Sequence, residues 1–273
     1  MKKQDRKKEL RGVKLVNYGL IIPTLQKEDY VLGGLTKLPK IVLQPNGQWD
    51  AFLPIPEYQA LGTETMACTC FGTLSANEII IRRKYTNEKN FSDRWLAWSA
   101  GITKNGADPH NTAEYLRKGG TPLQEHWDYT PDINTWEKFY ETPPAKLLDY
   151  ARENFLDKYS FGHEYVPSDI NLIKEALTYS PLGVSVYAWV ENGDGIFYKP
   201  AGARDNHWCV AYGWAERDGK FLLKIFDSYD NTQKIYDGMP MIIKRFHLEE
   251  RGLTPKKLTW WALVMRFFSG RNL

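Results

Sequence analysis

Residues 66–85 read MACTCFGTLSANEIIIRRKY, and this stretch decides how the first half of the chain folds. Four of its side chains recur at intervals of three and four, which is the spacing of one helix face: Phe71, Leu74, Ser75 and Glu78. Thr63 or Thr65, just before the stretch, is a residue type that caps helix N-termini. The pattern therefore predicts one long helix with a partly buried face.

Further helices are expected on both spacing and capping signals, such as Ser168-Asp169 before an apolar run. The predicted segments are 91–100, 110–118, 134–157 and 168–179. Before residue 60 the chain looks extended and rich in turns instead. The helices are thus concentrated between about residue 60 and residue 180.

From Pro181 onwards the sequence is typical of strands, because it is rich in valine, isoleucine and aromatic residues. The turn-like sequences ENGDG and ERDG separate some of these runs. The runs are GVSVYAWV (183–190), HWCVAYGWA (207–215), FLLKIFDSY (221–229) and TWWALVMRFF (259–268). Helices followed by antiparallel strands predict an α+β fold. We expect a helical half over about 60–180, a β half over about 181–268, and a cleft between them.

Composition excludes several classes of protein. Apolar residues make up 42% of the 273 and charged residues 25%, which is ordinary for a globular chain. The longest apolar run is six residues, Trp260 to Met265, far short of the roughly 20 that a membrane helix needs. The N-terminal stretch lacks the features of a signal peptide. We therefore expect a cytoplasmic protein with no membrane partner.

The charge is also unevenly distributed. Residues 1–14 hold seven Lys or Arg and two acidic residues, whereas the remaining chain has 29 basic and 31 acidic residues. The basic excess is therefore a terminal tail and not a face for nucleic acid, so we expect no nucleic-acid partner. No HExxH, CxxC, P-loop or GxGxxG pattern occurs, and the histidines outside the candidate site are scattered. No metal or cofactor is expected.

Three residues have the types and order of a thiol-based catalytic site. Cys68 lies near the start of the long predicted helix, where the helix dipole would favour the thiolate and lower its pKa. His207 opens a predicted strand 139 residues later, and Asp227 follows the next strand by 20 more. A hairpin between these strands would bring the acid beside the imidazole and fix its tautomer.

With these residues in place, the chain resembles the papain-like cysteine peptidases over about residues 55–268, and is most similar to divergent phage and bacterial members. The resemblance rests on five stretches: ACTCFGTLSANE, KNGADPHNTAEYLRKGGTP, PLGVSVYAW, DNHWCVAYGW and LLKIFDSYDN. It implies a papain-like fold with Cys68 as the nucleophile, His207 as the base and Asp227 as the orienting residue. It further implies that Gln59 and the backbone N–H of Cys68 form the oxyanion hole, and that Asn105 and Gly106 line the substrate groove.

The sequence also departs from the family pattern at the candidate site. Thr69, not Trp, follows Cys68, and Gln59 lies nine residues before that cysteine. Cys70 is a rival nucleophile, because aligning Phe71 with the tryptophan of the family selects it instead. We prefer Cys68, since that alignment leaves Gln59 available as an oxyanion donor. Tyr229 takes the place of a tryptophan that shields the third catalytic residue in the family.

The predicted function is a cysteine-type endopeptidase that acts on peptide or protein substrates through a thioester acyl-enzyme. One alternative is another Cys-His-Asp enzyme, such as a transglutaminase-like transferase, a cell-wall amidase or a leader-peptide protease. The other is a catalytically silent papain-fold module with a binding or structural role, for example in a virion. Residues 1–45 are expected to form a basic tail and an extended arm, and residues 46–273 the catalytic domain.

Overall fold

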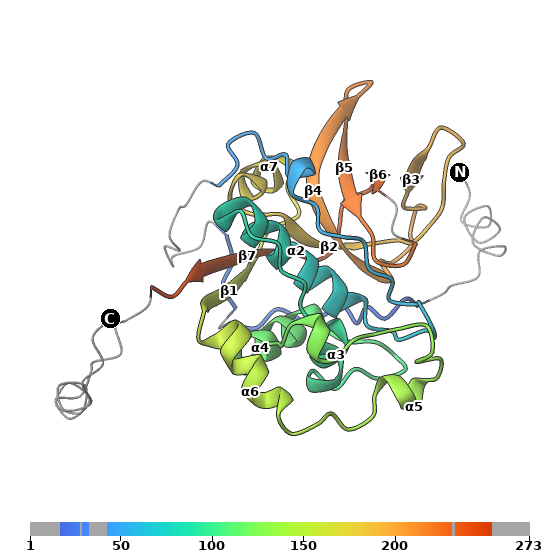
Figure 1. Ribbon diagram of the computed structural model, residues 1–273. Coiled ribbons are helices and arrows are strands. Elements are labelled where there is room, and N and C mark those ends of the chain that lie inside the picture. The colour runs from blue at the N-terminus through green and yellow to red at the C-terminus, as the bar shows by residue number, and fades with distance from the viewer. Residues whose placement is uncertain (1–16, 28, 33–42, 231–232, 253–273) are drawn as a thin grey trace, which may run out of the picture.

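The computed structural model describes residues 17–27, 29–32, 43–230 and 233–252 (Figure 1). These residues form a mixed sheet and a set of helices, which fits the predicted α+β class. The predicted strand at 259–268 and the basic residues 1–14 lie outside the described residues. None of the helices in the described ranges combines the length and the apolar character needed to cross a membrane.

Among the described residues the first α-helix is α2, which runs over Cys68–Tyr85, close to the predicted range 66–85. The remaining α-helices are α3 (Asp93–Ser99), α4 (Pro109–Gly119), α5 (Trp136–Phe139), α6 (Leu147–Ala151) and α7 (Ile170–Tyr179). Shorter 3₁₀ turns are η2 (Asp50–Phe52) and η3 (Gln124–His126), and a π-helical turn, η4, covers Arg152–Leu156.

Two local expectations were wrong. The single helix predicted over 134–157 is interrupted between α5 and α6, where Pro143-Pro144 stand in the sequence and cannot continue a helix. The helix α2 has Ala67 at its N-cap and no side-chain cap. The hydroxyl of Thr65 instead accepts from the backbone N–H of Ala67, one residue before the helix begins.

The described part of the chain forms a sheet of seven strands in the order β1-β7-β2-β4-β5-β6-β3. All neighbours are antiparallel except β3 and β6. The strands are β1 (Tyr159–Tyr165), β2 (Leu182–Val186), β3 (Ile196–Tyr198), β4 (His207–Arg217), β5 (Lys220–Phe226), β6 (Gln233–Asp237) and β7 (Ile243–Glu250). The edge strand β1 comes from the stretch expected to be helical, and it pairs with β7 near the end of the described chain.

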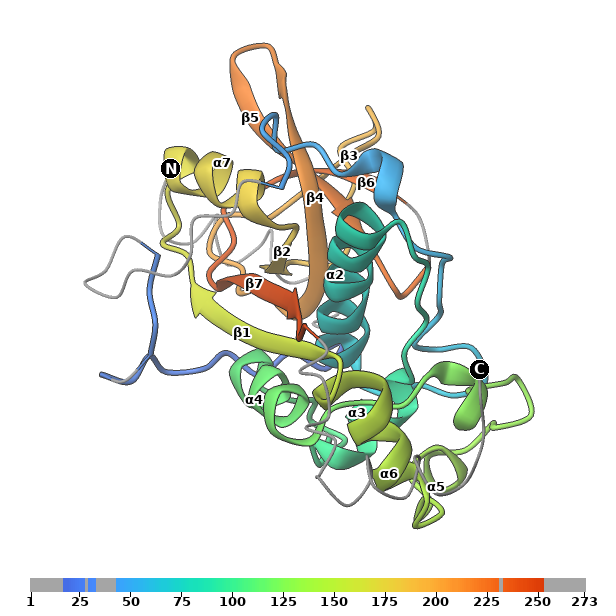
Figure 2. The ribbon, with the colours of Figure 1, turned by 60° about the vertical axis from the view of Figure 1, so that its left-hand side comes forward.

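Helix α2 packs against the sheet and contacts α3 and α4, and α3 to α6 gather in the lower part of both views (Figures 1 and 2). The contact depends on the buried Trp208 of β4. A Cβ atom on Gly72 of α2 would lie 2.8 Å from Trp208 Cδ1, and one on Gly183 of β2 would lie 2.3 Å from Cζ2. Because both glycines lack that atom, the indole fits between helix and sheet. The start of β4 is thereby held against α2.

An N-terminal arm, the described residues 17–27 and 29–32, packs along this body as extended chain. Leu20 forms a parallel bridge with Ala107, and the Ile21 N–H donates to the carbonyl of Ala107 at 2.7 Å. Farther along, Val31 forms a parallel bridge with Tyr165 of β1. The arm therefore connects the region before α4 with the edge of the sheet.

Candidate active site

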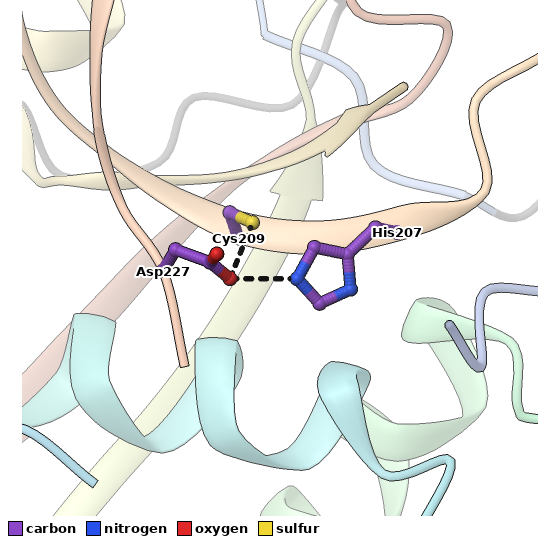
Figure 3. A group of neighbouring side chains, drawn as sticks. All are labelled: His207, Cys209 and Asp227. Atoms are coloured by element: carbon purple, nitrogen blue, oxygen red, sulfur yellow. Dashed lines mark hydrogen bonds and ion pairs between the residues drawn. The ribbon is translucent and has the colours of Figure 1, made fainter. Parts of the chain in front are cut away.

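The fold brings His207 and Asp227 together. His207 is the first residue of β4, and Asp227 follows the last residue of β5, to which β4 is paired through a tight turn. Both side chains are fully buried. His207 Nε2 lies 2.7 Å from Asp227 Oδ1 (Figure 3). The hairpin predicted from the sequence accounts for this contact.

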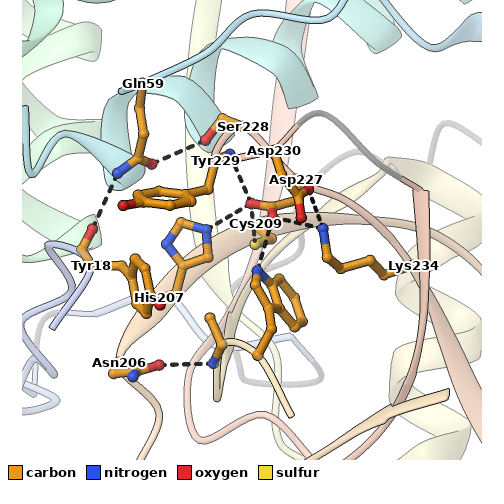
Figure 4. A network of polar contacts seen from close by, with 12 residues as sticks. Tyr18, Gln59, Asn206, His207, Cys209, Asp227, Ser228, Tyr229, Asp230 and Lys234 are labelled. Atoms are coloured by element: carbon orange, nitrogen blue, oxygen red, sulfur yellow. Dashed lines mark hydrogen bonds and ion pairs between the residues drawn. The ribbon is translucent and has the colours of Figure 1, made fainter. Parts of the chain in front are cut away.

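Asp227 is an ionised acceptor that several donors hold in place (Figure 4). Its Oδ2 accepts from the Trp189 indole N–H at 2.9 Å and from Lys234 Nζ at 3.0 Å. Its Oδ1 also accepts from the backbone N–H of Tyr229 at 3.1 Å. Burial alone would raise the pKa of Asp227, but His207 and Lys234 outweigh burial and hold this pKa below its usual range.

The imidazole of His207 is left with one unused nitrogen. An ionised carboxylate can only accept, so Nε2 carries the proton that it donates to Asp227. The other nitrogen, Nδ1, is buried and has no hydrogen-bond partner among the described residues. A neutral imidazole in this tautomer presents a lone pair at Nδ1, which is the form that a general base needs.

Cys68 is the first residue of α2 and is fully buried. The backbone N–H of Trp208, the neighbour of His207, acts on this thiol and favours its charged form. Burial raises the pKa of Cys68, and the N–H groups of Trp208 and Thr69 offset only part of that effect. The expected lowering of this pKa by the helix dipole is therefore outweighed by burial in this conformation.

The rival cysteine, Cys70, faces a different region of the molecule. Its thiol interacts with Thr69, with Thr112 of α4 and with Asp93 of α3. Burial and the nearby Asp93 raise the pKa of Cys70. Two residues along a helix turn a side chain by more than half a circle, so the two thiols point to different sides of α2, although Cys68 still acts on the pKa of Cys70.

A third cysteine lies beneath the His–Asp pair. Cys209 Sγ is 3.5 Å from Asp227 Oδ1, and the ligand atoms of His207, Cys209 and Asp227 all lie within 4.8 Å of one another. These residue types could ligate a soft metal ion. The Nε2 proton already joins His207 directly to Asp227, however, so a metal ion would have to displace the proton that orients the imidazole.

Gln59 is fully buried beside the residue that follows Asp227. Its Oε1 accepts from Ser228 Oγ at 3.2 Å, which fixes the orientation of the amide. Its Nε2 donates to Glu64 Oε1 at 3.3 Å and to the backbone carbonyl of Tyr18 at 3.4 Å. The predicted oxyanion donor thus points at a peptide carbonyl of the arm.

Tyr18 lies over the candidate site (Figure 4). Its ring centroid is 5.4 Å from that of His207 and 4.8 Å from that of Tyr229. Its backbone N–H donates to the carbonyl of Asn206 at 3.0 Å. One arm residue therefore contacts both the residue before the histidine and the amide of Gln59.

The predicted groove residues also contact the arm. The side chain of Asn17 donates to the carbonyl of Asn105 at 2.9 Å. Gly106 has a φ of +89°, and a Cβ atom on it would lie 2.0 Å from the carbonyl oxygen of Gly19. The backbone approaches Gly106 so closely that only glycine fits there.

No protein-family model and no curated protein sequence matches this chain. Solved structures do match it. Xylellain, a cysteine protease from Xylella fastidiosa, superimposes with a TM-score of 0.61 at 17% identity, over 87% of this chain and 96% of that one. The cysteine protease and lectin-like domains of Cwp84, a surface layer associated protein of Clostridium difficile, give 0.63 at 16%, over 92% and 60% of the two chains.

Digestive procathepsin L 3 from the larval midgut of Tenebrio molitor gives a TM-score of 0.56 at 14% identity, over 75% of this chain and 70% of that one. The chain has the fold of the papain-like cysteine peptidases. At these identities the likeness establishes the papain-like fold alone.

Several residues around the site were not predicted as functional. Trp189 ends the stretch PLGVSVYAW, and Lys234 lies three residues after LLKIFDSYDN, but nothing in either stretch indicates that these side chains contact Asp227. Cys209 could have been found, because it lies two residues after His207 in a strand and hence on the same face. Tyr18 belongs to the arm, whose path over a papain-like body no local sequence signal indicates.

Proposed function

We propose that this chain is a cysteine endopeptidase in which Cys68, His207 and Asp227 act together. The observation that carries the proposal is the state of His207. Its Nε2 is held by an ionised Asp227, while Nδ1 is buried and unpartnered among the described residues. The imidazole is therefore fixed on one side. The residue that follows it, Trp208, has a backbone N–H that acts on the Cys68 thiol, and this supports a thiol–imidazole pair.

In the proposed reaction His207 Nδ1 takes the proton of Cys68 while the thiolate attacks the carbonyl carbon of a peptide. Asp227 stabilises the imidazolium that forms. The tetrahedral oxyanion would be stabilised by the N–H of Cys68 and by Nε2 of Gln59. The imidazolium then protonates the departing amine, and water hydrolyses the thioester.

The contacts of Tyr18 support the same assignment of donors. Its carbonyl already accepts from Gln59 Nε2, and its N–H already donates to the carbonyl of Asn206, the residue before His207. These are the kinds of hydrogen bond that an extended peptide substrate would make. A peptide substrate must therefore displace this segment of the arm in order to make the same hydrogen bonds.

Intact-mass labelling at about pH 6 tests the proposal. Iodoacetamide at low dose or an epoxysuccinyl probe is applied to the wild type and to Cys68→Ala, Cys70→Ala and His207→Ala. We expect fast single labelling that is lost in Cys68→Ala and His207→Ala and kept in Cys70→Ala. Labelling no faster than that of a free thiol in every variant would contradict it and favour the silent binding module.

A peptide-library screen with mass detection then defines the reaction. Hydrolysis of internal peptide bonds supports the endopeptidase, whereas crosslinked products indicate a transglutaminase-like transfer. Release of amides from cell-wall fragments indicates an amidase. In each case Cys68→Ala is the control, and we expect it to reduce turnover by about a thousandfold or more.

A further inference from the structure

A polar cavity lies away from α2 and β4, the elements that carry Cys68 and His207. It has a volume of about 580 Å³ and is bounded by α4, β1, β7 and the N-terminal arm. The residues that matter for its chemistry are Asp29, His110, Glu114, His163, Tyr165 and Lys244. The proposed peptidase mechanism uses none of them.

Lys244 is a buried amine in this cavity without a direct carboxylate partner. Among the described residues no carboxylate oxygen lies within 4.0 Å of its Nζ. The Nζ is instead 3.0 Å from His163 Nδ1 and 3.4 Å from His110 Nδ1, and it lies 3.6 Å from the centroid of the Tyr165 ring. Burial lowers the pKa of Lys244 to about 7, and more distant carboxylates offset this effect only in part.

The nearby acidic side chains are engaged elsewhere. Glu114 is paired with Arg117 and Lys118, and its Oε1 also lies 3.0 Å from His163 Nε2. Asp108 caps α4 by accepting from the backbone N–H of His110. The carboxylates of α4 and its cap therefore leave Lys244 without a charge partner in contact.

Two further residues in the wall of this cavity carry polar groups. The hydroxyl of Tyr165 is buried and has no hydrogen-bond partner among the described residues, although the residue lines the cavity. Asp29 of the arm is also in the cavity wall, with Oδ1 3.3 Å from His110 Nδ1. A buried amine and an unused hydroxyl are donors for a negatively charged group, whereas the carboxylate of Asp29 at the edge opposes its binding.

We propose that this cavity binds a small oxyanion, a carboxylate or phosphate group, between the Lys244 ammonium and the Tyr165 hydroxyl. The ligand supplies the missing charge partner of Lys244 and the missing hydrogen bond of Tyr165. The carboxylate of Asp29 lies close enough to compete with it. Removal of this charge by Asp29→Asn therefore strengthens the binding of an oxyanion.

Nuclear magnetic resonance of the histidine rings tests this site directly in the full chain at pH 6. Sodium phosphate and sodium acetate are titrated separately, with sodium chloride at matched ionic strength as the control. We expect saturable shifts of the ring nitrogens of His110 and His163, while those of His126 and His247 stay unchanged. Saturation by phosphate alone would assign a phosphate-type ligand, and saturation by both would include carboxylates.

Four variants make the test specific. Lys244→Met should abolish the saturable shifts, and Tyr165→Phe should weaken binding by about tenfold. Asp29→Asn should tighten it, and Lys174→Met, outside the cavity, should leave it unchanged. If Lys244→Met does not fold, the conservative changes at Tyr165 and Asp29 decide. Identical shifts with chloride, or an affinity that neither conservative change alters, would overturn the proposal.

Discussion

At the scale of single residues, Asp227 determines the state of the candidate site. A buried carboxylate is stable only when charged and polar partners compensate for lost hydration. His207, Lys234, Trp189 and a backbone N–H provide those contacts. Asp227 therefore stays ionised although it is buried, and it imposes one tautomer on His207.

Replacing Lys234 with Met tests this balance through stability. We expect the free energy of unfolding at pH 7 to fall by about 2 kcal/mol, because a buried carboxylate loses a cation. The lowered pKa of Asp227 contributes stability above the unfolded value of about 4, and this contribution is lost as the pH falls below it. Urea unfolding should thus show a difference that shrinks below about pH 4. Lys220→Met, at the exposed pair with Asp237, is the control and should change little.

His163 provides a separate test of pH dependence. Burial, reinforced by Lys244, lowers its pKa to about 3. Between pH 6.5 and 3 the unfolded chain therefore binds more protons at this position, so stability falls as the pH is lowered through that window. We expect His163→Gln, which cannot titrate, to flatten this part of the curve of unfolding free energy against pH. Curves that stay parallel for wild type and variant would show that His163 does not titrate in this way.

At the scale of elements, periodicity predicted α2 and the β4–β5 hairpin, since both are set by residues close in sequence. The break between α5 and α6 was missed, because the helix pattern was extended across Pro143-Pro144. The missed cap has another cause. Thr65 satisfies an N–H one residue too early, since α2 begins only at Cys68.

The N-terminal arm is an element whose position no pattern predicted. Its bridge from Leu20 to Ala107 joins segments far apart in the sequence, and such pairing leaves no local signal. The residues predicted to receive a substrate backbone, Asn105 and Gly106, are those that meet the arm. The arm therefore occupies the place that a substrate is expected to take.

Replacing Tyr18 with Ala should expose the candidate site. The ring contact with His207 is lost, and the arm carbonyl is held less firmly at Gln59. We expect the rate of Cys68 alkylation by iodoacetamide to rise about tenfold, measured by intact mass against time. Leu25→Ala, at an exposed arm position, is the matched control and should leave the rate unchanged. Equal rates in both variants and the wild type would show that the arm does not limit access.

At the scale of the whole molecule, the order of residues along the sequence identified the candidate site residues but did not predict which distant elements contact each other. Cys68, His207 and Asp227 were selected by type and spacing, and the fold joins the last two directly. The pairing of β1 with β7, and the approach of Trp189 and Lys234 to Asp227, arise only when the complete sheet is assembled. Sequence patterns report the local period of a chain and not which distant elements become neighbours.

The junction of α2 with the sheet is where the global packing sets the position of the site. Trp208 fills the space left by Gly72. The position of its indole therefore affects both the adjacent His207 and the Trp208 N–H that acts on Cys68. Gly72→Ala would place a Cβ 2.8 Å from the indole, so we expect a loss of about 1–3 kcal/mol in unfolding free energy. We also expect slower labelling of Cys68 at the same pH, because a shift of Trp208 also shifts the adjacent His207, which is the proposed base.

A glycine without such a neighbour provides the comparison. Gly119 at the end of α4 has nothing within 4 Å of a built Cβ, so Gly119→Ala should be neutral or stabilising by up to about 1 kcal/mol. Both variants are compared by urea unfolding and by the rate of Cys68 labelling. If Gly72→Ala matched Gly119→Ala in both measurements, the helix–sheet contact at Trp208 would contribute neither to stability nor to the reactivity of Cys68.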